Sequence, residues 1–294
     1  MYSEHYQEEH LPEEEYYSEE DFPERRIEEA RKSVIVPHGY PTPLSFEKEV
    51  LYQNLIIEIS STSNSFIKNF EIELDRDYDY CVGFGVFVST GGSYVENNVC
   101  LNIYDSVRSY FDFTNIDLFK INSTVWKNNY FFPTFICARG NVLSFAVKGN
   151  KLDVDLKFSV FLKLVRGKKI EKPLYDYNFQ QTKMVHFLSD AIASDEFDVK
   201  LNNEYKEVVG FTVNGNLLSF LNMKIKTNTK IYLPLINMAN IVNSSGVPLF
   251  FKFLPLNIPA YRNIVSLYYD KFADSGLEDV YLITTFLLRR LHKG

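Results

Sequence analysis

An internal repeat constrains the fold of this chain more than any other feature of its sequence. Phe70–Val86 aligns without a gap on Phe197–Val213, 127 residues further on, and seven of the 17 positions are identical. A chance pairing of that length would share about one residue, given ordinary residue frequencies. Several of the differing positions keep their chemistry, as where Ile72 is matched by Val199. Part of the chain therefore occurs twice.

Two further blocks repeat in the same order along the chain. Residues 131–144 align on residues 253–266 with six identities, and Phe161-Leu162 aligns on Phe286-Leu287. Small changes of offset between the blocks are expected when insertions are confined to loops. The alternative is coincidence between two halves with similar patterning. Three collinear blocks without gaps favour a tandem duplication.

Length and composition set further limits. The chain has 294 residues, enough for two domains that each bury a core, and its 20 tyrosines and 25 phenylalanines favour strands. The sequence contains no run of about 18 apolar residues, so no transmembrane segment is predicted. The N-terminus lacks the pattern of a signal peptide. The three cysteines, Cys81, Cys100 and Cys137, are expected to be free, buried thiols in a reducing compartment.

The negative charge is concentrated at the N-terminus. Residues 1–34 hold 12 acidic and four basic residues, a net charge of -8. The other 260 residues hold 26 acidic and 27 basic residues, a net charge of +1. A nearly neutral body argues against a protein that reads nucleic-acid sequence, because such proteins carry a basic footprint. Within the acidic arm, Asp21-Phe22-Pro23-Glu24 predicts the start of a short helix that ends near Ser33. The helix is either a solvated charged segment or a docking element.

Period-two patterning dominates the rest of the chain. Apolar residues alternate with polar ones over Phe70–Leu74, and over Leu152–Leu164 they predict a strand of 13 residues. Asp279–Leu288 predicts a long closing strand, and Gly83 and its counterpart Gly210 predict a bulge. Only two short helices are predicted inside the halves, at Ile116–Ile121 and Phe187–Ala193.

About eight strands per half with no helical crossovers require antiparallel sheets. We therefore expect an all-β fold of two tandem eight-stranded antiparallel jelly-roll β-sandwiches, preceded by a short acidic arm or helix. The expected domains are an arm at 1–34, a first jelly roll at 35–166, a linker at 167–173 and a second jelly roll at 174–294. An immunoglobulin-like sandwich is the competing fold, but halves of about 100 residues are typical there.

Motifs of catalysis are absent from the sequence. There is no phosphate loop, GxSxG, HExxH or CxxC, so we expect no enzyme, no catalytic residue and no cofactor. A nucleophilic pair of cysteine and histidine could form only in space. The one weak candidate for a metal site is the triplet Asp75, Asp77 and Asp79, whose alternate carboxylates could converge on a calcium ion. The repeat replaces that triplet, so the competing interpretation is a polar turn between strands.

A chain of this length with two eight-stranded halves, a short linker and no catalytic motif resembles the double jelly-roll major capsid proteins of tailless icosahedral viruses, many of which have an internal membrane. The resemblance covers about residues 35–294 and rests on architecture rather than on a short motif. It implies a structural virion protein, made in the host cytoplasm, that assembles as homotrimers into pseudo-hexameric capsomers of a capsid shell. Neighbouring capsomers and minor capsid or membrane proteins would be its partners. The composition, rich in Lys, Asn, Tyr and Phe, suits a bacteriophage of an AT-rich host.

The acidic arm departs from that family, in which arms that lie on membrane or genome tend to be basic. An acidic arm is repelled by nucleic acid and anionic lipid, so a protein partner is the better expectation. Two alternatives stay open. A carbohydrate-binding or adhesin module could stack sugars on exposed tyrosines such as Tyr94, Tyr104 and Tyr110. A glycan hydrolase would need clustered carboxylates, for which the Asp75–Asp79 turn is the candidate.

Overall fold

The structure is a computed structural model that describes residues 49–88, 94–119, 132–167, 174–241, 252–261 and 263–291. The acidic arm with its predicted helix at residues 21–33, and the predicted linker after Gly167, lie outside the described residues. Within the described part, no helix is long and apolar enough to cross a membrane.

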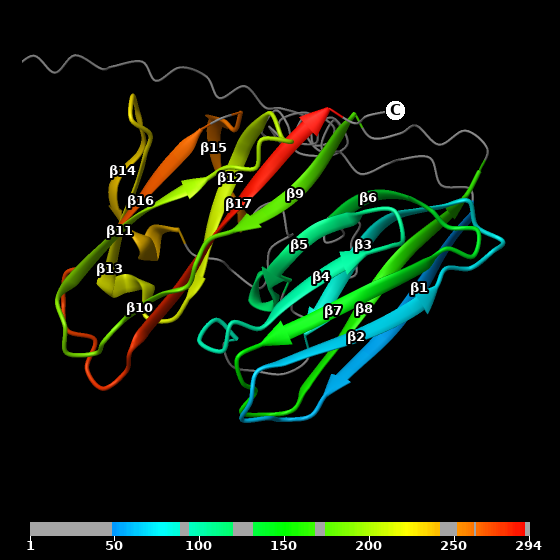
Figure 1. The fold of residues 1–294 in the computed structure, drawn as a ribbon, viewed down its shortest axis with the longest axis horizontal. Helices are drawn as coiled ribbons and strands as arrows, with labels where there is room; N and C mark the ends of the chain where they lie inside the picture. The colour runs from blue at the N-terminus through cyan, green and yellow to red at the C-terminus, as the bar shows by residue number, and fades with distance from the viewer. Residues whose placement is uncertain are drawn as a thin grey trace, which may run out of the picture. The chain divides into compact units, whose positions relative to one another are not determined.

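The first half of the fold, coloured blue to green in Figure 1, is made of eight strands. They are β1 (Glu49–Ile59), β2 (Phe66–Glu73), β3 (Tyr80–Val88), β4 (Cys100–Tyr104), β5 (Ser109–Asn115), β6 (Phe132–Cys137), β7 (Val142–Gly149) and β8 (Leu156–Arg166). A 3-10 helix, η2 (Ile116–Phe119), follows β5.

The second half runs from green to red in Figure 1. Its strands are β9 (Tyr175–Gln181), β10 (Val185–Phe187), β11 (Ala193–Lys200), β12 (Glu207–Gly215), β13 (Leu221–Lys226), β14 (Ile231–Asn237), β15 (Leu254–Pro259), β16 (Ile264–Lys271) and β17 (Val280–Leu291). Two 3-10 helices, η4 (Leu218–Phe220) and η5 (Met238–Asn240), flank β13 and β14.

Strand order defines the fold as a jelly roll in each half. The first half forms two four-stranded sheets in the orders β1-β8-β3-β6 and β2-β7-β4-β5. The second half repeats this with β17, β12 and β15 in one sheet and the order β11-β16-β13-β14 in the other. Both β9 and β10 pair antiparallel with β17, so they are one strand in two pieces. The predicted fold of two tandem eight-stranded jelly rolls is confirmed.

Each sandwich buries the inward face of its alternating strands. In the second half the core contains Leu282, Phe286 and Leu288 of β17 together with Val208 and Phe211 of β12. All five are fully buried. In the first half β8 does the same, since Leu156, Phe158 and the following alternate residues are buried. The pattern that predicted the strands is therefore the pattern that fills the cores.

The two halves correspond strand by strand, from β1 with β9 and β10 to β8 with β17. The pairing of β3 with its neighbours shifts between Cys81 and Gly83, and the pairing of β12 shifts at the equivalent step between Val208 and Gly210. The predicted bulge is thus present in both halves. Beyond the bulge, Gly83 pairs with Pro133 just as Gly210 pairs with Pro255, which agrees with the second sequence alignment.

A glutamine at the same place in each half ties the first strand to the turn that follows the second. Gln53 Nε2 donates to Glu73 O at 2.6 Å, and Gln53 Oε1 accepts from Asp75 N at 3.2 Å. In the second half Gln180 Nε2 donates to Lys200 O at 2.8 Å, and its Oε1 accepts from Asn202 N at 2.9 Å. Gln53 and Gln180 lie 127 residues apart, the offset of the first repeat.

The third sequence block is aligned wrongly by one residue. Phe84 pairs with Leu162, and its counterpart Phe211 pairs with Phe286, so Leu162 corresponds to Phe286. Phe161 instead corresponds to Thr285. A slip of one residue moves every side chain to the opposite face of a strand, and Leu162 and Phe286 both face a core.

Three predicted elements differ from the structure. The strand predicted from Leu152 begins at Leu156, and Leu152 makes only an isolated bridge with Thr62. The helix predicted at Ile116–Ile121 is described as the shorter 3-10 helix η2. The helix predicted at Phe187–Ala193 is wrong: this segment ends β10, turns and begins β11.

A buried lysine explains that turn. Lys271 Nζ donates to the carbonyl oxygens of Leu188, Ser189 and Ala191 at 2.7, 2.6 and 2.7 Å. Those carbonyls face an ammonium group instead of the amides of a following helical turn, so no helix forms.

Candidate functional site

The two halves meet at a junction formed by β5 and η2 of the first half and by β9, β17 and the segment before β15 of the second. Aromatic rings form its apolar centre. Phe179 of β9 stacks on Phe253 at a centroid distance of 5.7 Å and meets Phe119 of η2 edge-on at 5.8 Å. All three are 3% exposed or less. Burial of three rings stabilises this contact by several kcal/mol, at about 1.5–3 kcal/mol for each buried side chain.

The outward face of β17 belongs to this junction region. Ile283 and Leu287 are fully buried, yet neither is part of the hydrophobic core of the second sandwich. They alternate with core residues along the strand and so face the opposite side of the sheet. A sheet whose outward face is buried is covered by another layer.

Polar contacts fix the register of the junction. Asn115 N donates to Gln181 Oε1 at 2.5 Å, and Gln181 Nε2 lies 3.4 Å from Cys100 Sγ. Lys252 Nζ, on a lysine only 5% exposed, donates to Leu118 O at 2.9 Å. Bonds from buried polar groups are costly to break, because each group left without a partner costs about 1–3 kcal/mol. The halves are therefore held in one arrangement.

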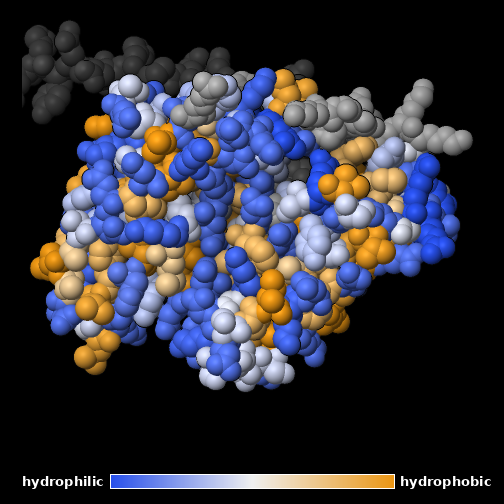
Figure 2. All heavy atoms as spheres, viewed as in Figure 1, coloured by the Kyte–Doolittle hydropathy of each residue, from blue (hydrophilic) through white to orange (hydrophobic). Residues whose placement is uncertain are grey.

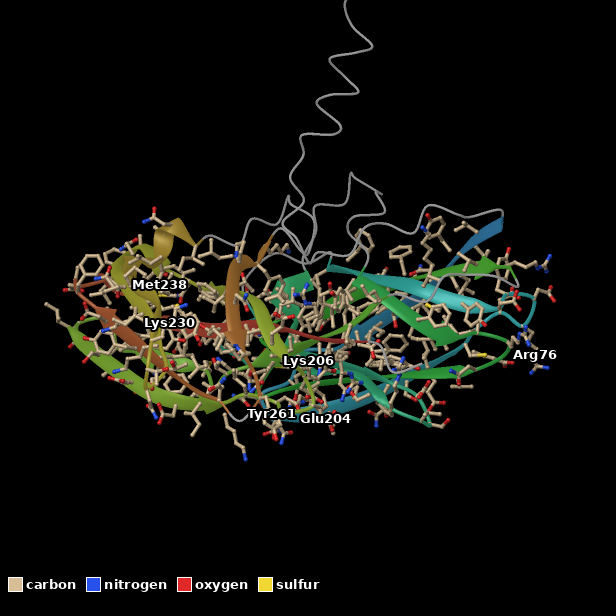
Figure 3. All side chains as sticks on the ribbon, turned by 90° about the horizontal axis from the view of Figure 1, so that it is seen from above. Arg76, Glu204, Lys206, Lys230, Met238 and Tyr261 are labelled. Atoms are coloured by element: carbon tan, nitrogen blue, oxygen red, sulfur yellow. The ribbon has the colours of Figure 1, made fainter. Side chains whose placement is uncertain are left out.

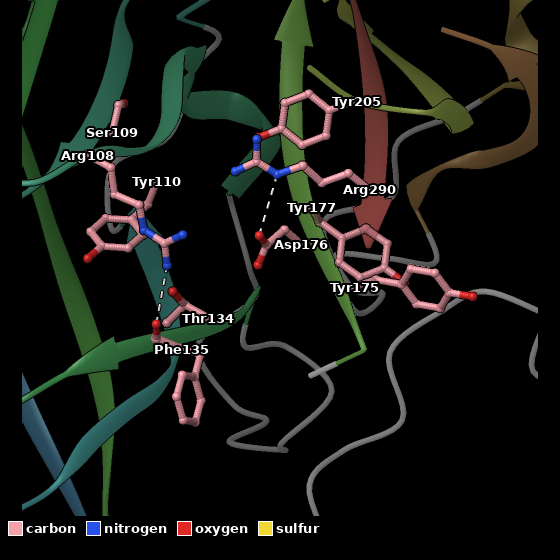
Figure 4. A pocket seen from close by; sticks show the side chains of 10 residues that line it. All are labelled: Arg108, Ser109, Tyr110, Thr134, Phe135, Tyr175, Asp176, Tyr177, Tyr205 and Arg290. Carbon is pink, nitrogen blue, oxygen red and sulfur yellow. Dashed lines mark hydrogen bonds and ion pairs between the residues drawn. The ribbon is translucent and has the colours of Figure 1, made fainter. Parts of the chain in front are cut away.

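A small pocket of about 30 Å³ opens at the edge of the junction (Figure 4). Two arginines reach it from different halves, each lying against a tyrosine ring. Arg108 lies 4.8 Å from the centroid of Tyr110, and Arg290 lies 4.9 Å from the centroid of Tyr205. Arg290 also pairs with Asp176 at 3.5 Å. A volume of this size holds one or two waters rather than an organic substrate.

Two tyrosines of the pocket, Tyr110 and Tyr177, are held neutral. Burial, and then the hydrogen bond that Tyr110 donates to Asp105, raise the pKa of Tyr110 well above its ordinary value. Burial raises the pKa of Tyr177 to about 12. A catalytic acid or base needs a pKa near the working pH, so these phenols are suited to packing and hydrogen bonding.

The acidic triplet predicted as a weak metal site serves the turn between β2 and β3. Asp75 Oδ1 accepts from Asp77 N at 2.8 Å, and Asp79 binds Arg139 at 2.6 Å and Gly167 N at 2.9 Å. The Gly167 amide and then the Arg139 guanidinium hold the pKa of Asp79 below its usual range. No group of three potential metal ligands occurs among the described residues. The side chains of Asp75 and Asp79 are therefore used to shape and close the turn.

Cysteine and histidine do not form a nucleophilic pair where the structure describes them. Burial raises the pKa of Cys81 to about 12, and burial also raises the pKa of Cys100. His186 Nε2 lies 2.7 Å from Asp279 Oδ2, and its ring stacks on Tyr281. All three cysteines are free as expected, but Cys137 is exposed rather than buried.

The tyrosines proposed for sugar stacking are poorly placed for that role. Tyr94 is 3% exposed, so its expected exposure is wrong. Tyr104 ends β4 and Tyr110 lies within β5, both half-buried in a sheet instead of extending from a loop.

The residues of the junction could not be recognised from the sequence. Gln181, Lys252 and Arg290 act across contacts between segments far apart in the chain. One signal was available for the related glutamines of β1 and β9, since they recur at the offset of the repeat.

Comparison with known proteins gave matches of structure alone. No family model matches the chain, and no curated protein matches it. Among solved structures, the chain is similar to PBCV-1 VP54, as fitted into a reconstruction of the virophage Sputnik, with a TM-score of 0.42 and 8% identity over 85% of this chain and 98% of that chain.

The chain is also similar to the major capsid protein of bacteriophage PM2, with a TM-score of 0.39 and 10% identity over 82% of this chain and 100% of that chain. A third similar structure is that of naturally occurring empty particles of cowpea mosaic virus, with a TM-score of 0.37 and 9% identity over 81% and 88% of the two chains. The assignment of the jelly-roll fold rests on the strand order given above.

Proposed function

We propose that this chain is the major capsid protein of a virus and that it assembles as trimeric, pseudo-hexameric capsomers of an icosahedral shell. The observation that carries the proposal is the presence of two equivalent jelly rolls in one chain, joined at a buried junction. Three copies of such a chain supply six similar blocks, which is the number needed to tile a shell with hexagonal units.

The proposal also covers the origin and limits of the two blocks. A tandem duplication accounts for the shared bulge and for the equivalent glutamines Gln53 and Gln180. We place the domains at residues 35–166 and 174–294, joined by a linker at 167–173 and preceded by the acidic arm at 1–34. In this role the chain is not an enzyme, and its location is the capsid shell of the virion after synthesis in the host cytoplasm.

The acidic arm is proposed to stabilise contacts between subunits. Its net charge of -8 disfavours nucleic acid and anionic lipid as partners and favours a basic protein surface. Neighbouring capsomers supply such a partner, and minor capsid or membrane proteins are further candidates.

Measurement of particle mass tests the proposal. Light scattering of the purified full chain should give the mass of three chains or of larger assemblies, and negative-stain images should show compact pseudo-hexagonal particles. A chain that stays monomeric over a range of concentration, salt and pH would rule out a capsid role.

Deletion of residues 1–33 tests the arm separately. Assembly beyond the capsomer should weaken, while the melting temperature of the remaining body should stay close to that of the full chain. Unchanged assembly of the deletion variant would remove the arm from the proposal.

A further inference from the structure

Tyr52 of β1 occupies the position that Phe179 occupies at the centre of the junction. Tyr52 pairs with Lys163 of β8, and Phe179 pairs with Leu287 of β17, which is the residue equivalent to Lys163. Phe179 is 1% exposed and Tyr52 is 48% exposed. The ring that is buried in the second half is therefore exposed in the first, although Lys163 beside it is buried like its counterpart Leu287.

Exposed residues continue from Tyr52 along β1, and the name β1 face is used here for Tyr52, Asn54 and Ile56. Asn54 corresponds to Gln181, whose side-chain amide accepts the Asn115 N–H in the junction. Asn54 is exposed, and Ile56 is 53% exposed. The β1 face thus offers an aromatic ring, a side-chain amide and an aliphatic group.

The opposite side of the junction also has a counterpart. The pairing of β13 with β14 has the same register shifts as the pairing of β4 with β5, so Asn237 corresponds to Asn115. Both asparagines cap the 3-10 helix that follows, by accepting the N–H two residues on at 2.9 and 3.0 Å. The β14 edge, defined here as residues 231–240, therefore corresponds to β5 and η2.

The β14 edge is more exposed than its counterpart at the residues equivalent to Asn115 and Leu118. Leu118 of η2 is fully buried and binds Lys252, whereas the equivalent Asn240 of η5 is exposed. Ile231 and Leu235 are 55% and 50% exposed. β14 ends its sheet with one strand neighbour, β13. Figure 3 labels Met238 within this edge and Lys230, the residue before it.

The paired stacks of cation and tyrosine recur as well. Lys230 lies 4.8 Å from the centroid of Tyr232, as Arg108 does from Tyr110. At the end of β8, Arg166 lies 5.5 Å from the centroid of Tyr78, the counterpart of Arg290 and Tyr205. Both components of the pocket in the junction are therefore present a second time, one beside the β14 edge and one beside the β1 face.

We propose that the β14 edge of one chain docks on the β1 face of a second copy, in the arrangement by which β5 and η2 pack on β9 within the chain. This inference rests on the proposed assembly and names its contact surface. Figure 2 shows hydrophobic residues in small groups among hydrophilic ones on the face that it displays, so hydrophobicity alone does not identify the surface. The equivalence of the two halves identifies the surface instead.

The contact is heterologous, since the two partners use different surfaces. Each copy carries one β14 edge and one β1 face, so copies join head to tail and either close into a ring or grow into a filament. The internal junction fixes the rotation between blocks, and repetition of that rotation decides which outcome occurs.

Charged substitutions on the two surfaces test the inference. Tyr52→Arg and Asn240→Arg should each reduce the mass measured by light scattering from that of the assembled chain to that of one chain, because each buries an unpaired charge in the contact. Val154→Arg and Leu277→Arg, at sites 57% and 101% exposed outside both surfaces, are matched controls and should leave the mass unchanged.

A mixture of the two variants sharpens the test. The Tyr52→Arg chain keeps an intact β14 edge, and the Asn240→Arg chain keeps an intact β1 face. An equimolar mixture should therefore form dimers that contain one chain of each variant. Recovery of pairing on mixing also shows that both variants are folded. Retention of the wild-type mass by both variants, or a mixture without pairs, would overturn the inference.

Cross-linking supplies an independent measurement. Asp112 and Phe179 line one cavity of about 290 Å³ in the junction, so the equivalent Pro234 and Tyr52 should face each other between copies. A Cys137→Ser chain carrying Tyr52→Cys and Pro234→Cys should give covalent dimers and trimers with a flexible bis-maleimide. The same chain with Leu277→Cys in place of Pro234→Cys should not. Assembly of the wild type without specific cross-links contradicts the inference alone, whereas a wild type that is always monomeric contradicts the proposed function.

Discussion

Tyr52 and Phe179 occupy the same position in two equivalent sheets, and yet one ring is 48% exposed and the other 1%. The difference arises from what lies over each sheet. Phe179 lies against Phe119 and Phe253, which belong to other segments of the chain. Position in the sheet is therefore equivalent in the two halves, while the environment is decided by the neighbouring block.

This pair predicts unequal effects of one substitution. Phe179→Ala should lower the free energy of unfolding by about 3–5 kcal/mol, the usual cost of truncating a buried aromatic ring. Tyr52→Ala should change it by no more than about 0.5 kcal/mol in the monomeric chain, as is usual for surface positions. Urea denaturation of both variants at low protein concentration measures the difference. Equal effects would show that the junction does not contribute to the stability of the chain.

The equivalent glutamines predict equal effects. Gln53→Ala and Gln180→Ala each remove two hydrogen bonds between the first strand and the following turn, so each should destabilise by about 1–2 kcal/mol. Because the two sites share no partner, the double variant should show the sum within about 0.5 kcal/mol. Chemical denaturation of the three variants measures this. A large effect at only one site would mean that the two turns differ in energy despite their equal geometry.

Alternation predicted the strands because a half-buried antiparallel strand imposes a period of two on its own sequence. The repeat predicted the bulge at Gly83 and Gly210, since both copies keep the glycine. Register in β8 and β17 was not predictable, because Phe161 and Phe286 look alike in a sequence although they face opposite sides of their sheets.

The helix wrongly predicted at residues 187–193 and the unrecognised junction between the halves have the same cause. The segment 187–193 has helical spacing, but its carbonyls bind Lys271, some 80 residues away in the sequence. In the same way, Gln181 meets Asn115 across 66 residues, and Lys252 meets Leu118 across 134. A local pattern carries no information about such partners, so long-range polar contacts require the fold to be known first.

Lys271 itself predicts a large loss of stability on substitution. Lys271→Met keeps the length of the side chain but removes the ammonium group that donates to the carbonyls of Leu188, Ser189 and Ala191. The free energy of unfolding should fall by about 3–5 kcal/mol, because hydrogen bonds to a charged group contribute about 1.5–3 kcal/mol each. Lys224→Met, on a half-buried side chain, is the control and should cost far less. A comparable effect of both substitutions in urea denaturation would contradict the role assigned to Lys271.

The turn between β2 and β3 predicts a dependence of stability on pH. The pKa of Asp79 is lowered from 3.8 by the Gly167 amide and then by Arg139, so folding favours the ionised carboxylate. A lowered pKa contributes stability that is complete above the ordinary pKa and is lost as the pH falls through the folded value. The melting temperature of Asp79→Asn should therefore lie below that of the wild type at neutral pH, and the two should converge below about pH 4.

Arg139→Gln provides the matched comparison for that titration. It removes the second contributor and leaves the Gly167 N–H in place, so its melting temperature should fall less than that of Asp79→Asn and should converge with the wild type over the same range of pH. Melting curves at closely spaced pH values between about 2 and 7 resolve this window. A constant difference between Asp79→Asn and the wild type at every pH would show that the carboxylate shapes the turn through its hydrogen bonds alone, without a contribution from its charge.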